Sequence, residues 1–385
     1  MDTTQFLSAL VILLIGLACY FVTKKTHYYA LFMIALGIVL GFFKVYLGLA
    51  IPTVLLEGIS AGALLLFSFL AGKSLIHNNS DTNSRRAFKE AIIILPATIV
   101  TVFLIAENYF GLGVVLSLVL SIIILALDYY ELEGKASATV YEIYYRESII
   151  IRPVVLILPT LIFLVFQNIY LQGATSGLIN AGKTIFLSIG IGIFLSLISI
   201  YFMKRHSSFL SFFSVIIILG LCYFASSILA GYFFIAAFVF GIFFANFEIP
   251  NRTHREKGYA HLMKYAEALV LLITGYIAYE FLSFNLFSKS LSIFFAALAI
   301  RTLGIFIAHK NDRISNTDKL VLSFYSGKSM AASVIIISLF FNFASNTYIG
   351  FNALLAIVFF LILLSEILSV LILILIGKRD LKKYY

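Results

Sequence analysis

Six ionisable side chains lie well inside long apolar runs of this sequence. They are three acids and three bases, namely Asp128, Glu147, Arg152, Arg301, Lys328 and Glu366. A charge at the centre of a membrane helix costs roughly 2.5–3.5 kcal/mol on insertion scales, so such residues mark function by default. The balanced set predicts pairing inside a helical bundle and indicates an ion pathway. The alternative is a packing role, in which ion pairs only fix the register of neighbouring helices.

Spacing adds detail at two of these positions. Ser148 and Arg152 are four residues apart, so they share one face of a helix, and Pro153 follows directly. A proline inside a membrane helix frees a backbone carbonyl, which is tolerated where the helix lines a cavity. Around Lys328, residues 323–329 read SFYSGKS. This small, polar text at mid-helix predicts either an unwound transporter helix or a close helix contact through Gly and Ser.

Composition identifies the class of protein that must position these residues. The chain has 385 residues, of which 62% are hydrophobic and 12% charged, whereas an average soluble domain is roughly 45–50% apolar and about 25% charged. A mean hydropathy of +1.06 excludes an ordinary soluble enzyme, a disordered protein and a fibrous one. Cys19 and Cys222 both lie in apolar runs, which is typical of small core residues. The sequence therefore predicts a polytopic protein of the lipid bilayer.

Thirteen apolar runs have the length of a membrane helix, which needs about 20 residues. Their approximate ranges are 5–23, 28–47, 53–74, 89–107, 111–134, 146–168, 183–203, 208–226, 229–247, 262–284, 289–309, 318–341 and 350–376. The alternating ten-residue pattern of a transmembrane barrel is not found. We therefore predict an all-α bundle of about 13 transmembrane helices, forming a single membrane transport domain over 1–385 with no soluble domain.

Lysine and arginine residues predict the orientation of this bundle. Of the 27, 21 fall in segments on one side of the predicted membrane, and three, Lys44, Lys183 and Lys289, fall on the other. The remaining three lie within spans. This predicts an N-terminus outside and a C-terminus in the cytoplasm. The net charge of +9 comes from these basic residues, which are distributed over all the inner loops. No nucleic-acid partner is therefore expected.

Two of the spans are similar to each other. Residues 30–43 contain Gly37 and Gly41, which align with Gly241 and Ala245 of the ninth span. An offset of seven spans reverses the direction of crossing, as inverted repeats of transporters require. Chance similarity between apolar helices is the alternative. With the repeat, helices 1–6 (about 5–168) and 8–13 (about 208–376) form inverted halves, and helix 7 (about 183–203) connects them.

Five segments in this order resemble the monovalent cation:proton antiporter (sodium/proton exchanger) superfamily over nearly the whole chain. They are LLLFSFLAGKSL (64–75), ALD (126–128), RESIIIRP (146–153), AFVFGIFFAN (237–246) and AIRTLGIFIA (299–308). The resemblance implies alternating access through two broken helices, the fifth and the twelfth, which cross near the midplane. It also implies a homodimer, no cofactor, and transport of protons with Na⁺ or K⁺ as small inorganic partners.

The resemblance also implies site residues. Asp128 is the carboxylate that a proton or an alkali cation loads, Leu127 supplies a backbone carbonyl, and Ser148 supplies a hydroxyl ligand. Asp128 and Ser148 would thus bind the metal cation, and Glu147 and Arg301 would form a structural ion pair. The chain departs from the family pattern where an Asn-Asp pair falls on residues 151–152, which are Ile and Arg.

Three hypotheses follow from this departure, because a fixed guanidinium repels a bound cation. In the first, the protein is a cation/proton antiporter with Asp128 and Glu366 as carriers. In the second, Arg152 and Lys328 bind an anionic substrate on the same fold. In the third, an Asp128–Arg152 pair closes the site and the protein does not transport.

An enzyme is not expected, since no nucleophile–base constellation, metal-ligand cluster or nucleotide loop is visible. The six histidines fall near inner helix ends or loops, where basic or interfacial roles are predicted. They are His27, His77, His206, His254, His261 and His309.

Overall fold

The computed structural model describes most of the chain as a bundle of helices. The described residues are 29–47, 52–75, 82–126, 137–203, 208–246, 252–312, 314–325, 329–342 and 350–382, and among them there is no strand. The predicted all-α class is therefore confirmed. The first predicted span, 5–23, lies outside the described residues, and each of the other twelve overlaps a described helix.

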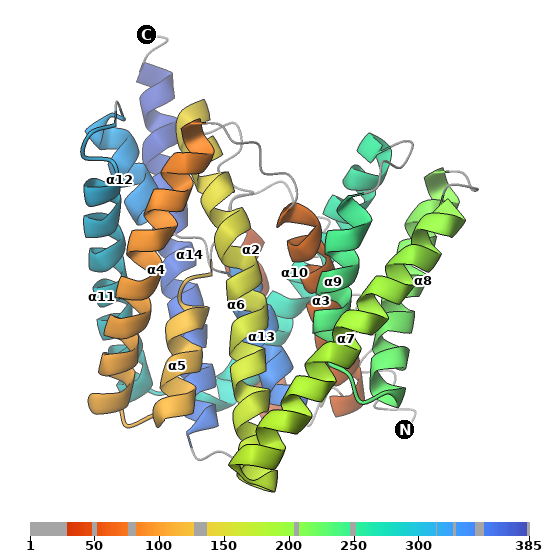
Figure 1. Cartoon of the computed structure of the whole chain (residues 1–385). Helices are drawn as coiled ribbons and strands as arrows, with labels where there is room; N and C mark the ends of the chain where they lie inside the picture. Colours follow the sequence, from red (N-terminus) through yellow and green to blue (C-terminus); the bar gives the residue numbers. More distant parts are fainter. Residues whose placement is uncertain are drawn as a thin grey trace.

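The helices follow one another with short connections. Their bounds are α2 Tyr29–Leu47, α3 Thr53–Ser74, α4 Thr82–Asn108, α5 Val114–Ile123, α6 Ala138–Gln172, α7 Ala174–Met203, α8 Ser208–Ile228, α9 Phe233–Ala245, α10 Arg252–Ala278, η3 Tyr279–Phe281, α11 Phe284–Ala308, α12 Asn316–Phe324, α13 Ser329–Asn342 and α14 Phe351–Lys382. In Figure 1, α4, α11 and α12 lie on one side of the bundle, α7, α8 and α9 lie on the other, and α6 and α13 run between them.

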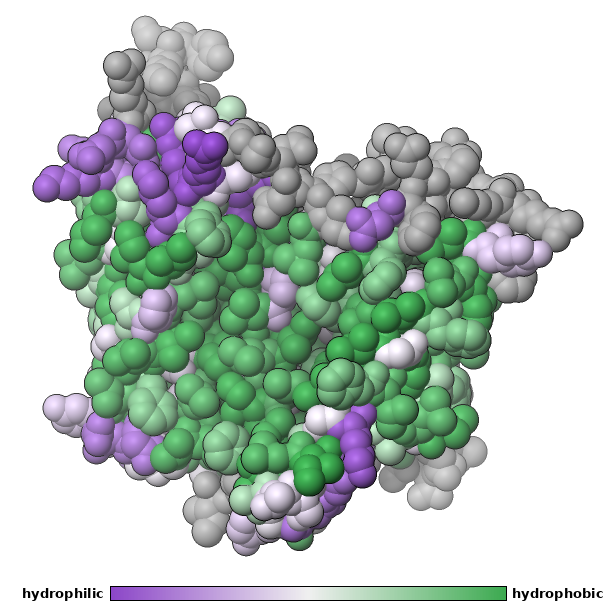
Figure 2. Space-filling view, viewed as in Figure 1, coloured by the Kyte–Doolittle hydropathy of each residue, from purple (hydrophilic) through white to green (hydrophobic). Residues whose placement is uncertain are grey.

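The surface has the character of a protein embedded in a bilayer. Seven of the described helices are long and apolar enough to cross a membrane, and five shorter apolar helices accompany them. Large apolar side chains such as Phe186, Ile228 and Phe284 are more than three-quarters exposed. Figure 2 shows a broad hydrophobic band between two rims where hydrophilic residues gather. The chain is an integral membrane protein.

Serine residues begin several of the helices. Ser137 precedes α6 and accepts a hydrogen bond from the backbone N–H of Val140 at 3.3 Å, and Ser315 accepts one from the N–H of Asp318 at the start of α12. Such caps satisfy backbone donors that a first helical turn leaves without partners. Because Ser137 starts α6 early, this helix is longer than the predicted span 146–168.

Two of the predicted spans are not continuous helices. Helix α5 has 10 residues, and Leu125 and Ala126, which follow it, form turns. Helix α12 has nine residues and ends at Phe324, and α13 begins at Ser329 and has 14. None of these reaches the roughly 20 residues of a full crossing. Helices α6 and α14 both contact α5, α12 and α13, so they flank the interrupted helices.

Close glycine contacts join two other pairs of helices, α2 with α10 and α3 with α9. A Cβ atom added to Gly37 or Gly275 in the first pair, or to Gly72 or Gly241 in the second, would collide with a backbone carbonyl oxygen of the opposite helix. Only glycine permits backbones to approach so closely, and membrane helices commonly associate in this way. We call these the two glycine crossings.

Candidate functional site

A buried ion pair joins α6 to α11. The guanidinium of Arg301 donates from Nη1 to Glu147 Oε1 at 2.9 Å and from Nη2 to Glu147 Oε2 at 2.7 Å. Both side chains are buried. Two parallel hydrogen bonds from one guanidinium to one carboxylate are the strongest form of this contact. The structure thus brings together the two residues that the sequence proposed as a structural pair.

Arg301 also reaches the end of α12. Its Nε donates to the backbone carbonyl of Leu322 at 3.1 Å, and its guanidinium lies 5.7 Å from the centre of the Tyr144 ring. The Tyr144 ring packs edge-on against Tyr325, the residue that follows α12. Arg301 therefore connects α6 and α11 to the point where the twelfth predicted span is interrupted.

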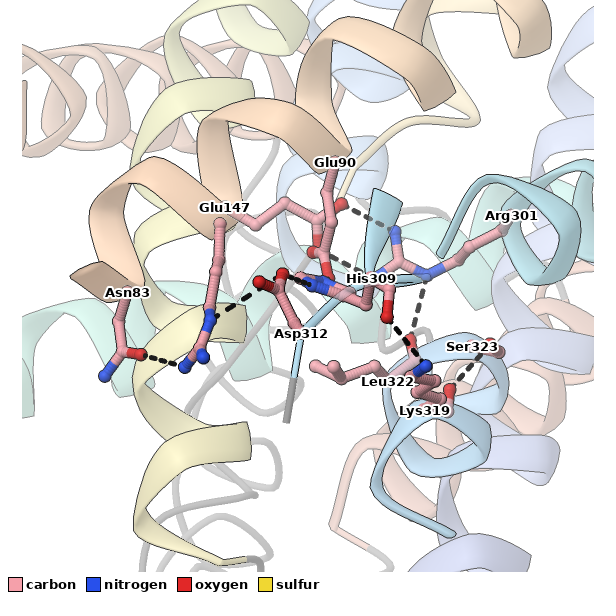
Figure 3. Close-up of polar contacts among 10 residues, drawn as sticks. Asn83, Glu90, Glu147, Arg301, His309, Asp312, Lys319, Leu322 and Ser323 are labelled. Atoms are coloured by element: carbon pink, nitrogen blue, oxygen red, sulfur yellow. Dashed lines mark hydrogen bonds and ion pairs between the residues drawn. The ribbon is translucent and has the colours of Figure 1, made fainter. Parts of the chain in front are cut away.

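A second polar group lies where α11 ends. His309 follows this helix, and its ring Nε2 bonds to the carboxylate of Glu90 on α4. The ring Nδ1 lies 2.8 Å from Asp312 Oδ2. Glu90 and His309 are completely buried, whereas the Asp312 side chain is 20% exposed. Figure 3 shows the imidazole between the two carboxylates, and we call Glu90, His309 and Asp312 the histidine cluster.

Cations surround the histidine cluster. The buried ammonium of Lys319 on α12 donates to the backbone carbonyl of His309 at 2.7 Å. Arg86 on α4 lies 3.7 Å from Asp312 and donates to Asn83 at 3.0 Å. Lys319 therefore ties the first turn of α12 to the end of α11, beside the histidine cluster (Figure 3).

These contacts shift the proton affinities of the cluster. Burial alone lowers the pKa of the His309 imidazole, but the hydrogen bonds and charges of Glu90 and Asp312 outweigh it and raise this pKa above its ordinary value. The hydrogen bond from His309 lowers the pKa of Asp312, although partial burial opposes this shift. The charges of Lys89 and Arg86 lower the pKa of Asp312 further. The charged imidazolium and the ionised Asp312 therefore stabilise each other.

Three further predicted site residues lie on the helices that flank the interruptions. Ser148 is buried on α6 and its hydroxyl donates to the carbonyl of Tyr145 at 2.7 Å. Its oxygen keeps a lone pair that can accept another bond. Arg152, one turn further along α6, and Glu366 on α14 are also buried.

The remaining predicted site residues, Leu127, Asp128 and Lys328, lie outside the described residues. Within the part of the chain that the structure describes, no group of three or more His, Cys, Asp or Glu side chains is placed to hold a metal ion. Of the predicted cation ligands, the structure therefore locates Ser148.

Sequence reasoning missed Glu90 and the role of His309. The histidine was expected to be basic or interfacial at a helix end, and it lies at one, but it is buried between two carboxylates. The spacing of three between His309 and Asp312 was a visible signal, because residues three apart meet on a helical turn. The contact with Glu90 spans 219 positions, and one sequence contains no signal for it.

The fold matches that of a known transporter. The structure of the sodium proton antiporter MjNhaP1 from Methanocaldococcus jannaschii at pH 8 is similar to this chain with a TM-score of 0.71 and 16% sequence identity, covering 97% of this chain and 100% of the other. The chain therefore has the fold of a sodium proton antiporter, and the resemblance predicted from the sequence is confirmed at that level. No family model and no curated protein matches the sequence.

Proposed function

We propose that the protein is a secondary transporter that exchanges a monovalent cation for protons by alternating access, with Asp128 as the midplane carboxylate. The observation that carries this proposal is the interruption of α5 and of α12–α13 within a fold similar to that of a sodium proton antiporter. Ends of half-helices expose unpaired backbone groups and partial charges at membrane depth, which is where transporters bind ions.

The pattern of helix contacts supports two inverted halves. The offset of seven predicted spans pairs α2 with α9, α3 with α10, α4 with α11, α5 with α12–α13 and α6 with α14. When each helix is replaced by its counterpart in the other half, an observed contact becomes another observed contact. Thus α2–α10 matches α3–α9, α4–α6 matches α11–α14, and α5–α6 matches α13–α14.

The glycine crossings agree with the same register. The overlay of Gly37 on Gly241 equates two glycines that each approach a backbone carbonyl of the partner helix. The same offset of 204 residues brings Gly72 within one position of Gly275, the partner of Gly37. A glycine contact on both sides of the exchange supports the repeat over chance similarity of apolar helices.

In this proposal, Asp128 takes up either a proton or the alkali cation, and Leu127 and Ser148 supply the carbonyl and hydroxyl oxygens beside it. Glu366, buried on α14, is a second candidate carrier. The Glu147–Arg301 pair is structural, since each group already satisfies the charge of the other. The transported ions are substrates, and no resident cofactor is required.

Arg152 supports a different candidate function for the protein. It is buried on α6, one turn from Ser148, and arginine keeps its charge at every relevant pH. With Lys328, it would attract an anionic substrate on the same fold. Alternatively, an Asp128–Arg152 pair would close the site and leave a protein that does not transport.

Flux measurements in proteoliposomes separate these functions. Proteoliposomes that contain the wild type, Asp128→Asn or Arg152→Gln are loaded with a pH probe. Each preparation is then given gradients of Na⁺, K⁺ or anions. Cation-driven proton flux that disappears in Asp128→Asn supports the antiporter. Anion flux that disappears in Arg152→Gln supports the anion transporter. If no gradient produces flux, the antiporter hypothesis and the anion-transporter hypothesis are both wrong.

Arg152→Asp sharpens this experiment, and Glu280→Gln is its control. The aspartate restores the acid that the resemblance implies at this position, and an added negative charge favours cation binding. We expect faster cation/proton exchange than in the wild type. Glu280 pairs with Lys44 near the end of α10 and lies outside the proposed site, so its amide variant should exchange at the wild-type rate.

The arrangement in the membrane belongs to the same proposal. The N-terminus lies outside, the C-terminus lies in the cytoplasm, and two copies form a homodimer. Accessibility of single introduced cysteines to an impermeant thiol reagent in intact cells tests the orientation. The mass of the detergent-solubilised particle tests the dimer.

A further inference from the structure

We propose that Glu90, His309 and Asp312 form a proton-binding site separate from Asp128, and that the bound proton holds α12 in place. The transport proposal assigns no role to these residues. Three observations support this site: the number of protons that its hydrogen bonds require, its access to the surface through Asp312, and the attachment of α12 to His309.

The two contacts of the His309 ring require one more proton than neutral histidine carries. Both ring nitrogens lie beside carboxylate oxygens, of Asp312 at Nδ1 and of Glu90 at Nε2. An ionised carboxylate only accepts hydrogen bonds, and a neutral imidazole has a single N–H. Both contacts are hydrogen bonds only when an additional proton is bound within the cluster, on the imidazole or on a carboxyl group.

The cluster runs from the surface to the interior. Asp312 is partly exposed, and His309 and Glu90 are fully buried behind it. Imidazole accepts a proton at one nitrogen and releases the other from the opposite nitrogen, so it can pass protons along such a row. The site therefore exchanges protons with the water on the side of the membrane where Asp312 lies.

Charged groups on each neighbouring element face this site. Arg86 and Lys89 on α4 act on Asp312, and Lys319 on α12 bonds to the His309 carbonyl. Glu147 on α6 and Arg301 on α11 act electrostatically on Glu90, but they form a neutral pair with each other. Arginine and lysine keep their charge near neutral pH, so among the described groups around this site the histidine cluster is the one that titrates there.

Loss of the proton breaks one of the two contacts of the ring. A neutral His309 keeps one N–H, so a ring lone pair then faces either Glu90 or Asp312, and two acceptors repel each other. His309 lies in the turn between α11 and α12, and its carbonyl accepts the hydrogen bond of Lys319. A rearranged turn therefore loosens the attachment of α12.

The direction of the pH effect follows from the raised pKa of His309. Stabilisation by a group with a raised pKa is complete below the pKa of the unfolded state, about 6.5 for histidine, and is lost as the pH rises through the folded value. Helix α12 is therefore held below pH about 6.5 and is released as the pH rises through the raised pKa of His309. Helix α12 ends at the interruption, so its release would reach the ion site if the transport proposal holds. Proton binding itself does not depend on transport.

Hydrogen–deuterium exchange of the purified full chain in detergent tests this site without measuring transport. Exchange of the α12 peptide is followed from pH 6 to pH 9 and corrected for the intrinsic pH dependence of amide exchange. In the wild type we expect protection of α12 to fall with a midpoint above about 6.5. In Glu90→Gln the midpoint should fall by about one pH unit, because a neighbouring carboxylate shifts a pKa by about 1–3 units.

Glu280→Gln is the matched control, because it makes the same chemical change at an ion pair on another helix, and its midpoint should equal that of the wild type. Should Glu90→Gln not fold, Asp312→Asn at the exposed end of the cluster should lower the midpoint in the same direction. Protection of α12 that does not change with pH in the wild type would overturn the proposal. So would a midpoint that is the same in the wild type and in whichever cluster variant folds.

Discussion

Two regions of this bundle hold their helices together by different means. Where α4, α6, α11 and α12 meet, the contacts are charged: Glu147 with Arg301, and His309 with two carboxylates. At the glycine crossings, α2–α10 and α3–α9 approach through backbone atoms, without a charged contact between the glycines and their partners. Lipid offers helices almost no hydrophobic gain from association, so close packing and polar pairs must hold them together.

The difference indicates which region responds to its surroundings. The glycines that make these crossings carry no titratable side chain, and their closest contacts are to backbone atoms. Buried charges are costly in a membrane, and their contacts change when a proton or an ion binds. We therefore expect the glycine crossings to act as a fixed scaffold and the charged region to contain the parts that move.

The largest expected effect comes from breaking the buried ion pair. Arg301→Gln leaves Glu147 buried without its partner charge, and removing one member of a buried pair costs about 3–5 kcal/mol. We expect a strongly lowered midpoint in a thermal unfolding experiment in detergent. The double variant Glu147→Gln/Arg301→Gln removes both charges and should recover much of the loss. A single variant as stable as the double would show that the pair does not stabilise the fold.

A smaller loss is expected at a glycine crossing. The added methyl group of Gly72→Ala would meet backbone atoms of α9, and overpacking of this kind costs about 1–3 kcal/mol. Gly62→Ala on the same helix is the control, because an added Cβ there meets nothing within 4 Å. Alanine favours helix by about 1 kcal/mol over glycine, so this control should be neutral or more stable in the same assay. Equal stabilities of the two variants would contradict the close crossing.

The smallest effect is expected at an ion pair near the surface. Lys44 and Glu280 form a pair in which about a third of each side chain is exposed, 32% and 37%. Exposed pairs contribute about 0–1 kcal/mol and are screened by salt. Glu280→Gln should therefore change the unfolding temperature slightly at low salt and not at 1 M salt. A loss as large as that of Arg301→Gln would remove the distinction between buried and exposed charges in this protein.

The sequence predicted the helices well where a run of apolar residues is long and continuous. The range 53–74 is the extent of α3 itself, Thr53–Ser74, and α2 agrees with its predicted range within one residue. The prediction differed where polar residues extend a helix beyond the apolar core, as at the start of α4 and α6. Hydropathy reports the part of a helix in the membrane and not the helix itself.

The interruptions could not be read from hydropathy either. Residues 111–134 and 318–341 are apolar enough to read as continuous spans, yet α5 ends at Ile123 and α12 ends at Phe324. The family resemblance implied these breaks, whereas apolar periodicity did not. A helix is interrupted when its neighbours supply the contacts that its backbone loses, and those neighbours are distant in sequence.

The sequence alone determined that this chain is a helical membrane protein with charges buried among its helices, because the cost of each charge in lipid is a property of the residue and its span. The tertiary structure decided which charges meet. Glu147 contacts Arg301, which lies 154 positions away in the sequence, and Glu90 contacts His309, which lies 219 positions away. Partner choice depends on the packing of helices, and packing is set by the whole chain.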